Sequence, residues 1–168
     1  AIGYAASKDV LLVHAAGNDG KNNDKSDNFP YDFQDAYPNW IEVGASSWKS
    51  GSKALATFSN YGKTEVDIFS PGVDIYSTTP ENHYEAYDGT SMASPVVSGV
   101  AAFVWSYYPD LSAAQLKEII LKSSVPIKGR VRIPGIKRKT RAHKISKTGG
   151  LVNLPNALRL AEETLSKE

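Results

Sequence analysis

The seven residues Gly89-Thr90-Ser91-Met92-Ala93-Ser94-Pro95 constrain this chain more than any other segment, because they place a serine at the start of a long helical pattern. From Ala93 to Tyr108 the valines and tyrosines recur every three or four residues, which is the spacing of a buried helix face. Between them stand the small residues Ser94, Ser98, Gly99, Ala101 and Ala102. Such a helix can lie close against its neighbours, so we expect a central helix that holds Pro95 in its first turn and ends at Pro109.

A serine at the start of such a helix has two chemical interpretations. Its hydroxyl becomes a nucleophile when a base takes its proton, and the oxyanion formed by its attack needs fixed donors. A helix N-terminus offers free backbone N–H groups and a positive dipole end, so Ser91 lies where negative charge is favoured. Ser and Thr are also common helix caps, and Gly-Thr-Ser alone would more often be a cap than a nucleophile.

A second segment, Val10 to Asn18, predicts another part of such a site. Val10-Leu11-Leu12-Val13 is a short continuous apolar run, typical of a buried parallel strand. The turn Gly17-Asn18-Asp19-Gly20 follows at the carboxyl end, which is where open α/β sheets bind ligands. The Asn18 amide could donate to an oxyanion there, although an isolated Gly-Asn would be an ordinary turn.

Together the two segments resemble the nucleophile motif and the oxyanion asparagine of the subtilisin-like serine proteases (subtilases, peptidase family S8). The resemblance continues in order through residues 1 to about 125 and 148 to 168. The further segments that carry it are Ala36-Tyr37-Pro38, Ile41-Glu42-Val43-Gly44-Ala45, Phe58-Ser59-Asn60-Tyr61-Gly62, Val66 to Ile75, and Gly149-Gly150-Leu151-Val152-Asn153.

The resemblance implies a partial subtilisin-like three-layer α/β fold with a mainly parallel sheet and packed helices. It implies a secreted or cell-envelope serine endopeptidase that hydrolyses a protein or peptide substrate through an acyl-enzyme, with Ser91 as the nucleophile. The Asn18 side chain and the Ser91 N–H would hold the oxyanion, a role known from an asparagine of subtilisin. Ala15, Ala16 and Gly17 would form one wall of the S1 pocket.

The family's other two catalytic residues have no visible counterpart in this sequence. Subtilase triads run Asp, His, Ser along the chain, with Asp-Ser/Thr-Gly and His-Gly-Thr stretches that do not occur here. We therefore expect the carboxyl-terminal half of a catalytic domain, inactive by itself because the base and its orienting acid lie outside it. Of the three histidines, His14 is expected to be partly buried at a strand end, His83 to be solvated in a hairpin turn, and His143 to belong to a basic stretch.

Two other functions remain open. A non-catalytic subtilase-like binding domain would keep the fold and contact a partner through a basic segment, but such a domain would be free to lose Ser91 and Asn18. A sedolisin-type serine peptidase also has a Gly-Thr-Ser motif, but its oxyanion residue is an acid, so Asn18 disfavours this class.

Composition fits one globular domain over residues 1–168. The net charge of +1 gives no overall attraction to nucleic acid, and 41% hydrophobic residues can bury a core. There is no apolar run of about 18 residues, so we expect no membrane contact. The absence of cysteine excludes disulfides. Apolar surface left by a missing half makes self-association, or binding of that half, the expected partner interaction.

Two segments look like elaborations of the family pattern. The first, Asp19 to Asp35, would border the S1 pocket, and calcium takes oxygen ligands of the kind that its acids offer. Its acids are Asp19, Asp24, Asp27, Asp32 and Asp35. Their spacing matches no fixed metal loop, so we expect a solvated loop, with no metal or other cofactor in this chain and calcium only as an option for the whole domain.

The second segment, Lys128 to Lys147, holds nine basic residues and no acid. Such a run can bind an anionic surface. Here, however, Val131, Ile133 and Ile136 punctuate the charges, and Pro134-Gly135 signals a turn. We therefore predict a basic β-hairpin inserted at about 126–147, between two helices.

The remaining layout follows from periodicity and caps. Strands are expected near 10–14, 40–45, 54–58, 65–69, 73–78 and 83–87, and helices near 1–8, 91–107, 112–123 and 154–166. Ser112 is a predicted N-cap, with Gln115 completing a capping box.

Overall fold

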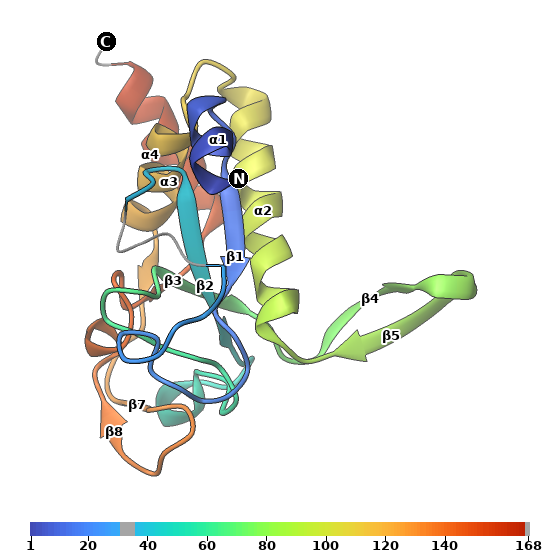
Figure 1. Cartoon of the computed structure of the whole chain (residues 1–168), viewed down its shortest axis with the longest axis vertical. Helices are drawn as coiled ribbons and strands as arrows, with labels where there is room; N and C mark the ends of the chain where they lie inside the picture. Colours follow the sequence, from blue (N-terminus) through green and yellow to red (C-terminus); the bar gives the residue numbers. More distant parts are fainter. Residues whose placement is uncertain (31–35, 167–168) are drawn as a thin grey trace.

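A five-stranded sheet forms the centre of the computed structural model, which describes residues 1–30 and 36–166 (Figure 1). Its strands stand in the order β1 (Leu12–Ala15), β2 (Trp40–Ser46), β3 (Ile68–Pro71), β9 (Gly150–Leu151) and β6 (Val125–Pro126). The first four pair in parallel, and β6 runs antiparallel to β9. The predicted α/β class with a mainly parallel sheet is confirmed.

Three helices pack on one face of this sheet. They are α2 (Thr90–Tyr107), α3 (Ala113–Lys122) and α4 (Leu154–Leu165), and a shorter helix, α1 (Ile2–Ser7), leads into β1. The buried core between helices and sheet joins alternate residues of β2 to the valine face of α2. Its central members are Ile41, Val43, Ala45, Val97, Val100 and Val104. The three- and four-residue spacing in the sequence therefore identified the buried face of α2 correctly.

The two carboxyl-terminal helices begin with the polar groups that their sequences provide. The Ser112 side chain accepts the Gln115 N–H, and the Gln115 side chain accepts the Ser112 N–H, so the predicted capping box is present. At α4 the side chain of Asn153 accepts the Asn156 N–H. Each cap satisfies backbone donors that a helix start leaves without partners.

A second, smaller core covers the opposite face of the sheet. Phe69 of β3 and Leu151 of β9 pack there against apolar residues of the basic segment. These partners are Val131, Ile133, Ala142 and Ile145, all buried. The predicted basic hairpin forms between β7 (Val131–Arg132) and β8 (Lys139–Thr140), followed by a 3-10 turn, η3 (Ala142–Lys144). Its apolar residues thus anchor it to the sheet while its basic residues remain at the surface.

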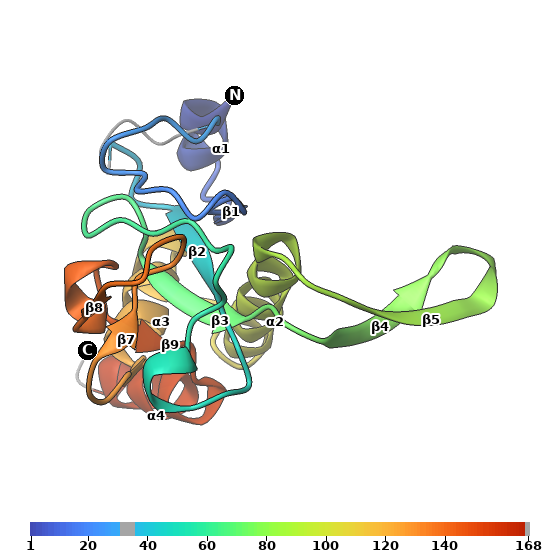
Figure 2. The same ribbon diagram turned by 90° about the horizontal axis from the view of Figure 1, so that it is seen from below.

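A second hairpin projects away from the body of the molecule (Figure 2). It consists of β4 (Ile75–Thr79), a short turn η2 (Pro80–Asn82) and β5 (His83–Tyr87), paired antiparallel as predicted. Every residue of β5 is exposed, including His83. None of the helices in the described residues is long and apolar enough to cross a membrane.

The predicted strand at 54–58 is wrong. A 3-10 turn, η1 (Gly51–Lys53), folds this part of the chain back over the end of β2, where Leu55 forms one isolated antiparallel bridge with Ser46. Buried apolar residues in a reversing segment resemble a strand in the sequence, but here they form a single bridge and no ladder.

Several strand boundaries also differ from the prediction, those of β3 and β1 among them. The side chain of Asp67 accepts the Glu42 N–H, and regular pairing on β3 begins at Ile68, opposite Val43, three residues later than the predicted start near 65. The strand β1 begins at Leu12, and Val10 is 45% exposed. Within the described residues β1 has a strand partner on one side only, so it is half-buried and the expectation of a fully buried strand was wrong.

Candidate active site

Ser91 lies exposed in the first turn of α2, beside the carboxyl ends of the parallel strands. The turn before it is tied to the end of β3, because the Gly89 N–H donates to the Gly72 carbonyl at 2.8 Å. Gly89 occupies the N-cap position, and no side chain caps this helix. The structure therefore removes the interpretation of Ser91 as a helix cap. Pro95 is the sixth residue of the helix, not a first-turn residue as expected, because the helix begins at Thr90.

The Asn18 side chain is fixed by two hydrogen bonds from Thr90. The backbone N–H and the hydroxyl of Thr90 both donate to Asn18 Oδ1, each at 2.9 Å. A backbone N–H can only donate, so the amide atom that faces it must be the oxygen. The Asn18 Nδ2 donor group consequently points away from the Thr90 donors and makes no hydrogen bond to another described residue.

Both candidate oxyanion donors border Gly89. A Cβ placed on Gly89 would lie 3.6 Å from the Ser91 backbone nitrogen and 3.7 Å from Asn18 Nδ2. The Ser91 N–H is in the first helical turn, where no carbonyl of the same helix can accept it. Two donors at one turn, one of them at the positive end of an 18-residue helix, suit a developing negative charge.

Thr90 and Asn60 position the candidate site through hydrogen bonds, and the sequence interpretation did not assign them this role. Thr90 is fully buried, and its hydroxyl also accepts the Gly17 N–H at 3.1 Å. Asn60 Oδ1 accepts the N–H groups of Asp19 and Lys21, each at 3.0 Å. Both residues stand inside segments that carry the family resemblance, but their partners are 39 to 73 residues away, so local patterns could not reveal the contacts.

Gly17 has no tolerance for a side chain in this turn. Its φ of +99° lies in a region that favours glycine, and a Cβ would come within 2.6 Å of Asn60 Nδ2. The Asn60 N–H also donates to the Gly17 carbonyl at 2.8 Å. The segment that carries Asn18 is thereby held between Thr90 on one side and Asn60 on the other.

The predicted substrate wall, Ala15 to Gly17, is braced by two asparagines of the following loop. Asn28 Nδ2 donates to the Ala15 carbonyl at 3.0 Å, and Asn23 Nδ2 donates to the Ala16 carbonyl at 2.9 Å. Ala16 is fully buried, whereas Ala15 and Gly17 are half-buried. Only Ala15 and Gly17 therefore present surface to a ligand.

His14 lies on the face of the sheet that looks away from α2. Its neighbour Val13 packs into the core beneath α2, and side chains alternate between faces along a strand. The His14 ring contacts Glu42, with Nδ1 2.8 Å from Oε2, and packs on Trp40 at a centroid distance of 4.9 Å. Asn28 also donates to Glu42. His14 is thus the partly buried strand-end residue that was expected, with a carboxylate partner that was not foreseen.

The acidic loop after Asn18 is held in place by the carboxylate of Asp24. Burial raises the pKa of the Asp24 carboxyl, but hydrogen bonds from Thr64, Glu65 and Lys63 together outweigh it and hold the pKa below its ordinary value. In the described part of the chain, no three acidic or histidine side chains are grouped to hold a metal. Asp32 and Asp35 lie outside the described residues.

The fold and the turn at Ser91 define an α/β protein with a serine-bearing helix at the carboxyl edge of a parallel sheet. Residues 1–153 match the model of the subtilase family. The chain belongs to that family.

Individual relatives agree with this assignment. Subtilisin DY of Bacillus licheniformis is 39% identical over 117 residues, which cover 70% of this chain and 40% of that protein. An intracellular serine protease of Paenibacillus polymyxa is 33% identical over 140 residues, covering 80% of this chain and 41% of the relative. The structure of sphericase superposes with a TM-score of 0.71 at 30% identity, covering 91% of this chain and 51% of sphericase. The chain thus spans about half or less of the length of these proteins.

Proposed function

We propose that this chain carries the nucleophile and the oxyanion donors of a serine endopeptidase, as the carboxyl-terminal half of a catalytic domain. The observation that carries the proposal is the pair of hydrogen bonds from Thr90 to Asn18 Oδ1, which fixes the amide with its Nδ2 donor near Gly89, two residues before Ser91. The half-domain assignment is supported by the coverage of 40% of Subtilisin DY and by the absence of the family's Asp and His motifs from the sequence.

In this proposal Ser91 Oγ attacks the carbonyl carbon of a peptide bond while a base outside this chain takes its proton. The carbonyl oxygen becomes an oxyanion held by Asn18 Nδ2 and the Ser91 N–H. Collapse of this intermediate expels the amine, which takes up the proton, and leaves an acyl-enzyme on Ser91. Water then hydrolyses the ester. Ala15 and Gly17 contact the side chain before the bond. A secreted or cell-envelope location stays a prediction.

The test is covalent labelling of Ser91 by a fluorophosphonate near neutral pH. We expect little labelling of the chain alone and strong labelling when it is expressed together with the segment that supplies the acid and the histidine. Ser91→Ala should abolish the signal. Labelling of the chain alone that is lost in Ser91→Ala would contradict the half-site and would require a base within this chain, beginning with His14. No labelling in either state would contradict the proposed function.

A further inference from the structure

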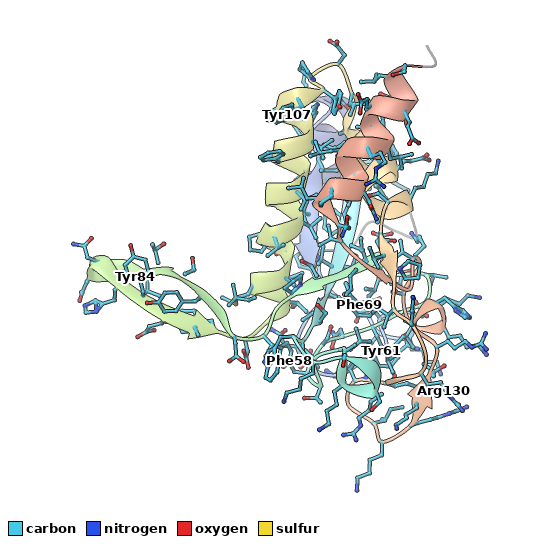
Figure 3. All side chains as sticks on the ribbon, turned by 180° about the vertical axis from the view of Figure 1, so that it is seen from behind. Phe58, Tyr61, Phe69, Tyr84, Tyr107 and Arg130 are labelled. Carbon is cyan, nitrogen blue, oxygen red and sulfur yellow. The ribbon has the colours of Figure 1, made fainter. Side chains whose placement is uncertain are left out.

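A cavity of about 320 Å³ opens beside the turn that carries Ser91. Its walls include Asp88, which directly precedes Gly89, together with Ser47 after β2 and Val73 after β3. Phe58 lines it as well, and in Figure 3 this side chain lies in the lower part of the molecule, near the place where the projecting hairpin leaves the body. The cavity is therefore adjacent to the candidate active site, at the ends of β2 and β3.

The cavity is lined by more positive than negative charge. Lys49 and Lys53 come from the segment around η1, and Arg132 comes from the basic hairpin; Asp88 is the acid among the lining residues. Asp88 is already engaged, because its Oδ1 accepts the Asp74 N–H at 2.7 Å. Three cations against one carboxylate give the lining residues a net positive charge, which suits an added anion.

The basic hairpin is fixed where it lines the cavity. Val131 and Ile133, on either side of Arg132, are buried in the second core. The Gly135 N–H donates to the Thr57 carbonyl at 2.9 Å, next to Phe58. This anchoring holds the backbone of Arg132 in place, so the side chain that lines the cavity comes from a well-packed strand. A guanidinium suits a carboxylate, which it can bind through two parallel hydrogen bonds.

The cavity and the predicted S1 wall follow different strands of the sheet. The wall of Ala15 and Gly17 follows β1, whereas the cavity follows β2 and β3, which come next in the sheet. A peptide that places one side chain against the wall and its carbonyl at Ser91 would continue across the sheet edge toward the cavity. The residues after the scissile bond would then meet Lys53 and Arg132.

We propose that this cavity binds an acidic side chain, Asp or Glu, that follows the scissile bond in the peptide substrate. Lys53 and Arg132 meet the carboxylate, while Leu55, Ala56 and Phe58 contact its methylene groups. The proposal rests on the proposed peptidase function, because it identifies the site as a substrate subsite. It makes the basic hairpin a specificity element.

The first test measures peptide binding and does not depend on catalysis. The chain is titrated with two short peptides that differ only in Glu or Gln at one position after the intended bond, and the amide signals are followed by NMR. We expect the Glu peptide to shift signals of Lys53, Thr57 and Arg132 and to bind about two- to fivefold more tightly, the range for one exposed ion pair. Raising the salt concentration should reduce this difference.

Variants show whether the preference belongs to the cavity. Arg132→Gln and, separately, Lys53→Gln should reduce the preference for Glu, whereas Lys137→Gln, an exposed change in the same hairpin, should leave it intact. Equal binding of both peptides, or an equal loss in all three variants, would overturn the proposal. The dispersion of the NMR spectrum shows whether each variant is folded. If Arg132→Gln does not fold, Lys53→Gln still tests the proposal.

Hydrolysis separates this proposal from the peptidase function. If the assembled domain cleaves both peptides at equal rates, the activity stands and the acidic subsite fails. If the Glu peptide binds selectively through Arg132 while Ser91 is not labelled by a fluorophosphonate, the anion-binding cavity stands and the peptidase function fails.

Discussion

Thr90 links the two halves of the candidate oxyanion site through a single buried side chain. Its hydroxyl accepts from Gly17 and donates to Asn18, and its backbone N–H donates to Asn18 as well. These bonds fix the amide before any substrate arrives, so its reorientation costs nothing during the reaction. The candidate catalytic serine is thus placed beside a donor that its own neighbour orients.

The first prediction concerns Asn18. In the assembled domain, Asn18→Ala should lower kcat about 10²- to 10³-fold with little change in KM, which is the loss known for removing such an asparagine from a subtilisin. Asn18→Asp is the matched control, because its carboxylate still accepts both hydrogen bonds from Thr90 but cannot donate to an oxyanion. Steady-state kinetics should show a comparable loss in both variants. Full activity in Asn18→Asp would mean that Asn18 acts only through the Thr90 contact.

The second prediction concerns the buried hydroxyl of Thr90. Thr90→Val keeps the shape but leaves the Gly17 N–H without its acceptor, so we expect the free energy of unfolding to fall by about 1–3 kcal/mol. Urea denaturation of the chain measures this. Thr90→Ser keeps the hydroxyl and should lose less stability than Thr90→Val. If both variants are equally destabilised, packing of the methyl group matters more than the hydrogen bonds.

At the scale of elements, the loop after Asn18 is joined to the segment before β3 by one carboxylate. Asp24 accepts the backbone N–H groups of Lys63, Thr64 and Glu65 and the hydroxyl of Thr64. A bridge between Asn22 and Tyr61 lies beside these contacts. The loop segment around Asn23, whose side chain supports Ala16, is therefore attached to the segment that follows Asn60.

The third prediction is a pH dependence of this anchor. The pKa of Asp24 is lower in the folded chain than in the unfolded chain, so the carboxylate stabilises the fold at pH values above its unfolded pKa of about 3.9. This stabilisation is lost as the pH falls through the lower pKa of the folded state. Asp24→Asn should therefore unfold at lower urea concentration than the parent at pH 7, and the difference should shrink below about pH 4.

Asp27→Asn serves as the control for this measurement. It removes one exposed charge from the same loop and none of the hydrogen bonds to residues 63–65. A pH-independent difference between Asp24→Asn and the parent, or the same difference in Asp27→Asn, would contradict the role of the Asp24 carboxylate.

The sequence predicted elements well where their signals are local. The apolar spacing within α2 and α3 predicted their buried faces and their approximate ends. The capping box at Ser112 formed as expected. The two-residue strands β6 and β9 have no such signal, because each exists only through pairing with a distant segment. The apolar residues of segment 54–58 wrongly predicted a strand, because they are buried next to a turn and not in a sheet. The Thr90 and Asn60 contacts likewise required the tertiary fold.

At the scale of the whole molecule, α2 is covered on one side only by the described residues. Its outward side combines small residues with two stacked aromatic rings, Phe103 and Tyr107, whose centroids are 5.3 Å apart. Tyr107 is 66% exposed and lies on the outer side of the upper part of the helix (Figure 3). The unpaired side of β1 in the described sheet adds a strand edge. Surfaces of this kind usually mark an interaction site.

Gly99 is an exposed glycine within α2. A Cβ placed on it would find no atom within 4 Å, so the described structure gives no steric reason for a glycine. An exposed glycine inside a helix costs about 0.5–1 kcal/mol relative to alanine. A close approach by the segment that completes the proposed domain would explain why a small residue is kept there.

The fourth prediction compares the effect of replacing Gly99 on the stability of the chain alone with its effect on assembly with the completing segment. Gly99→Ala and Gly99→Leu should both raise the free energy of unfolding of the chain alone by roughly 0.5–1 kcal/mol, because alanine and leucine have similarly high helix propensity. Only leucine adds bulk at the contact, and overpacking of a tight interface typically costs about 1–3 kcal/mol. In co-expression with the completing segment, Gly99→Leu should therefore lower the yield of complex and the labelling of Ser91, while Gly99→Ala should have a smaller effect. Thermal unfolding and analytical size exclusion measure the two quantities. A leucine that stabilises the chain and leaves assembly unchanged would show that the completing segment binds elsewhere.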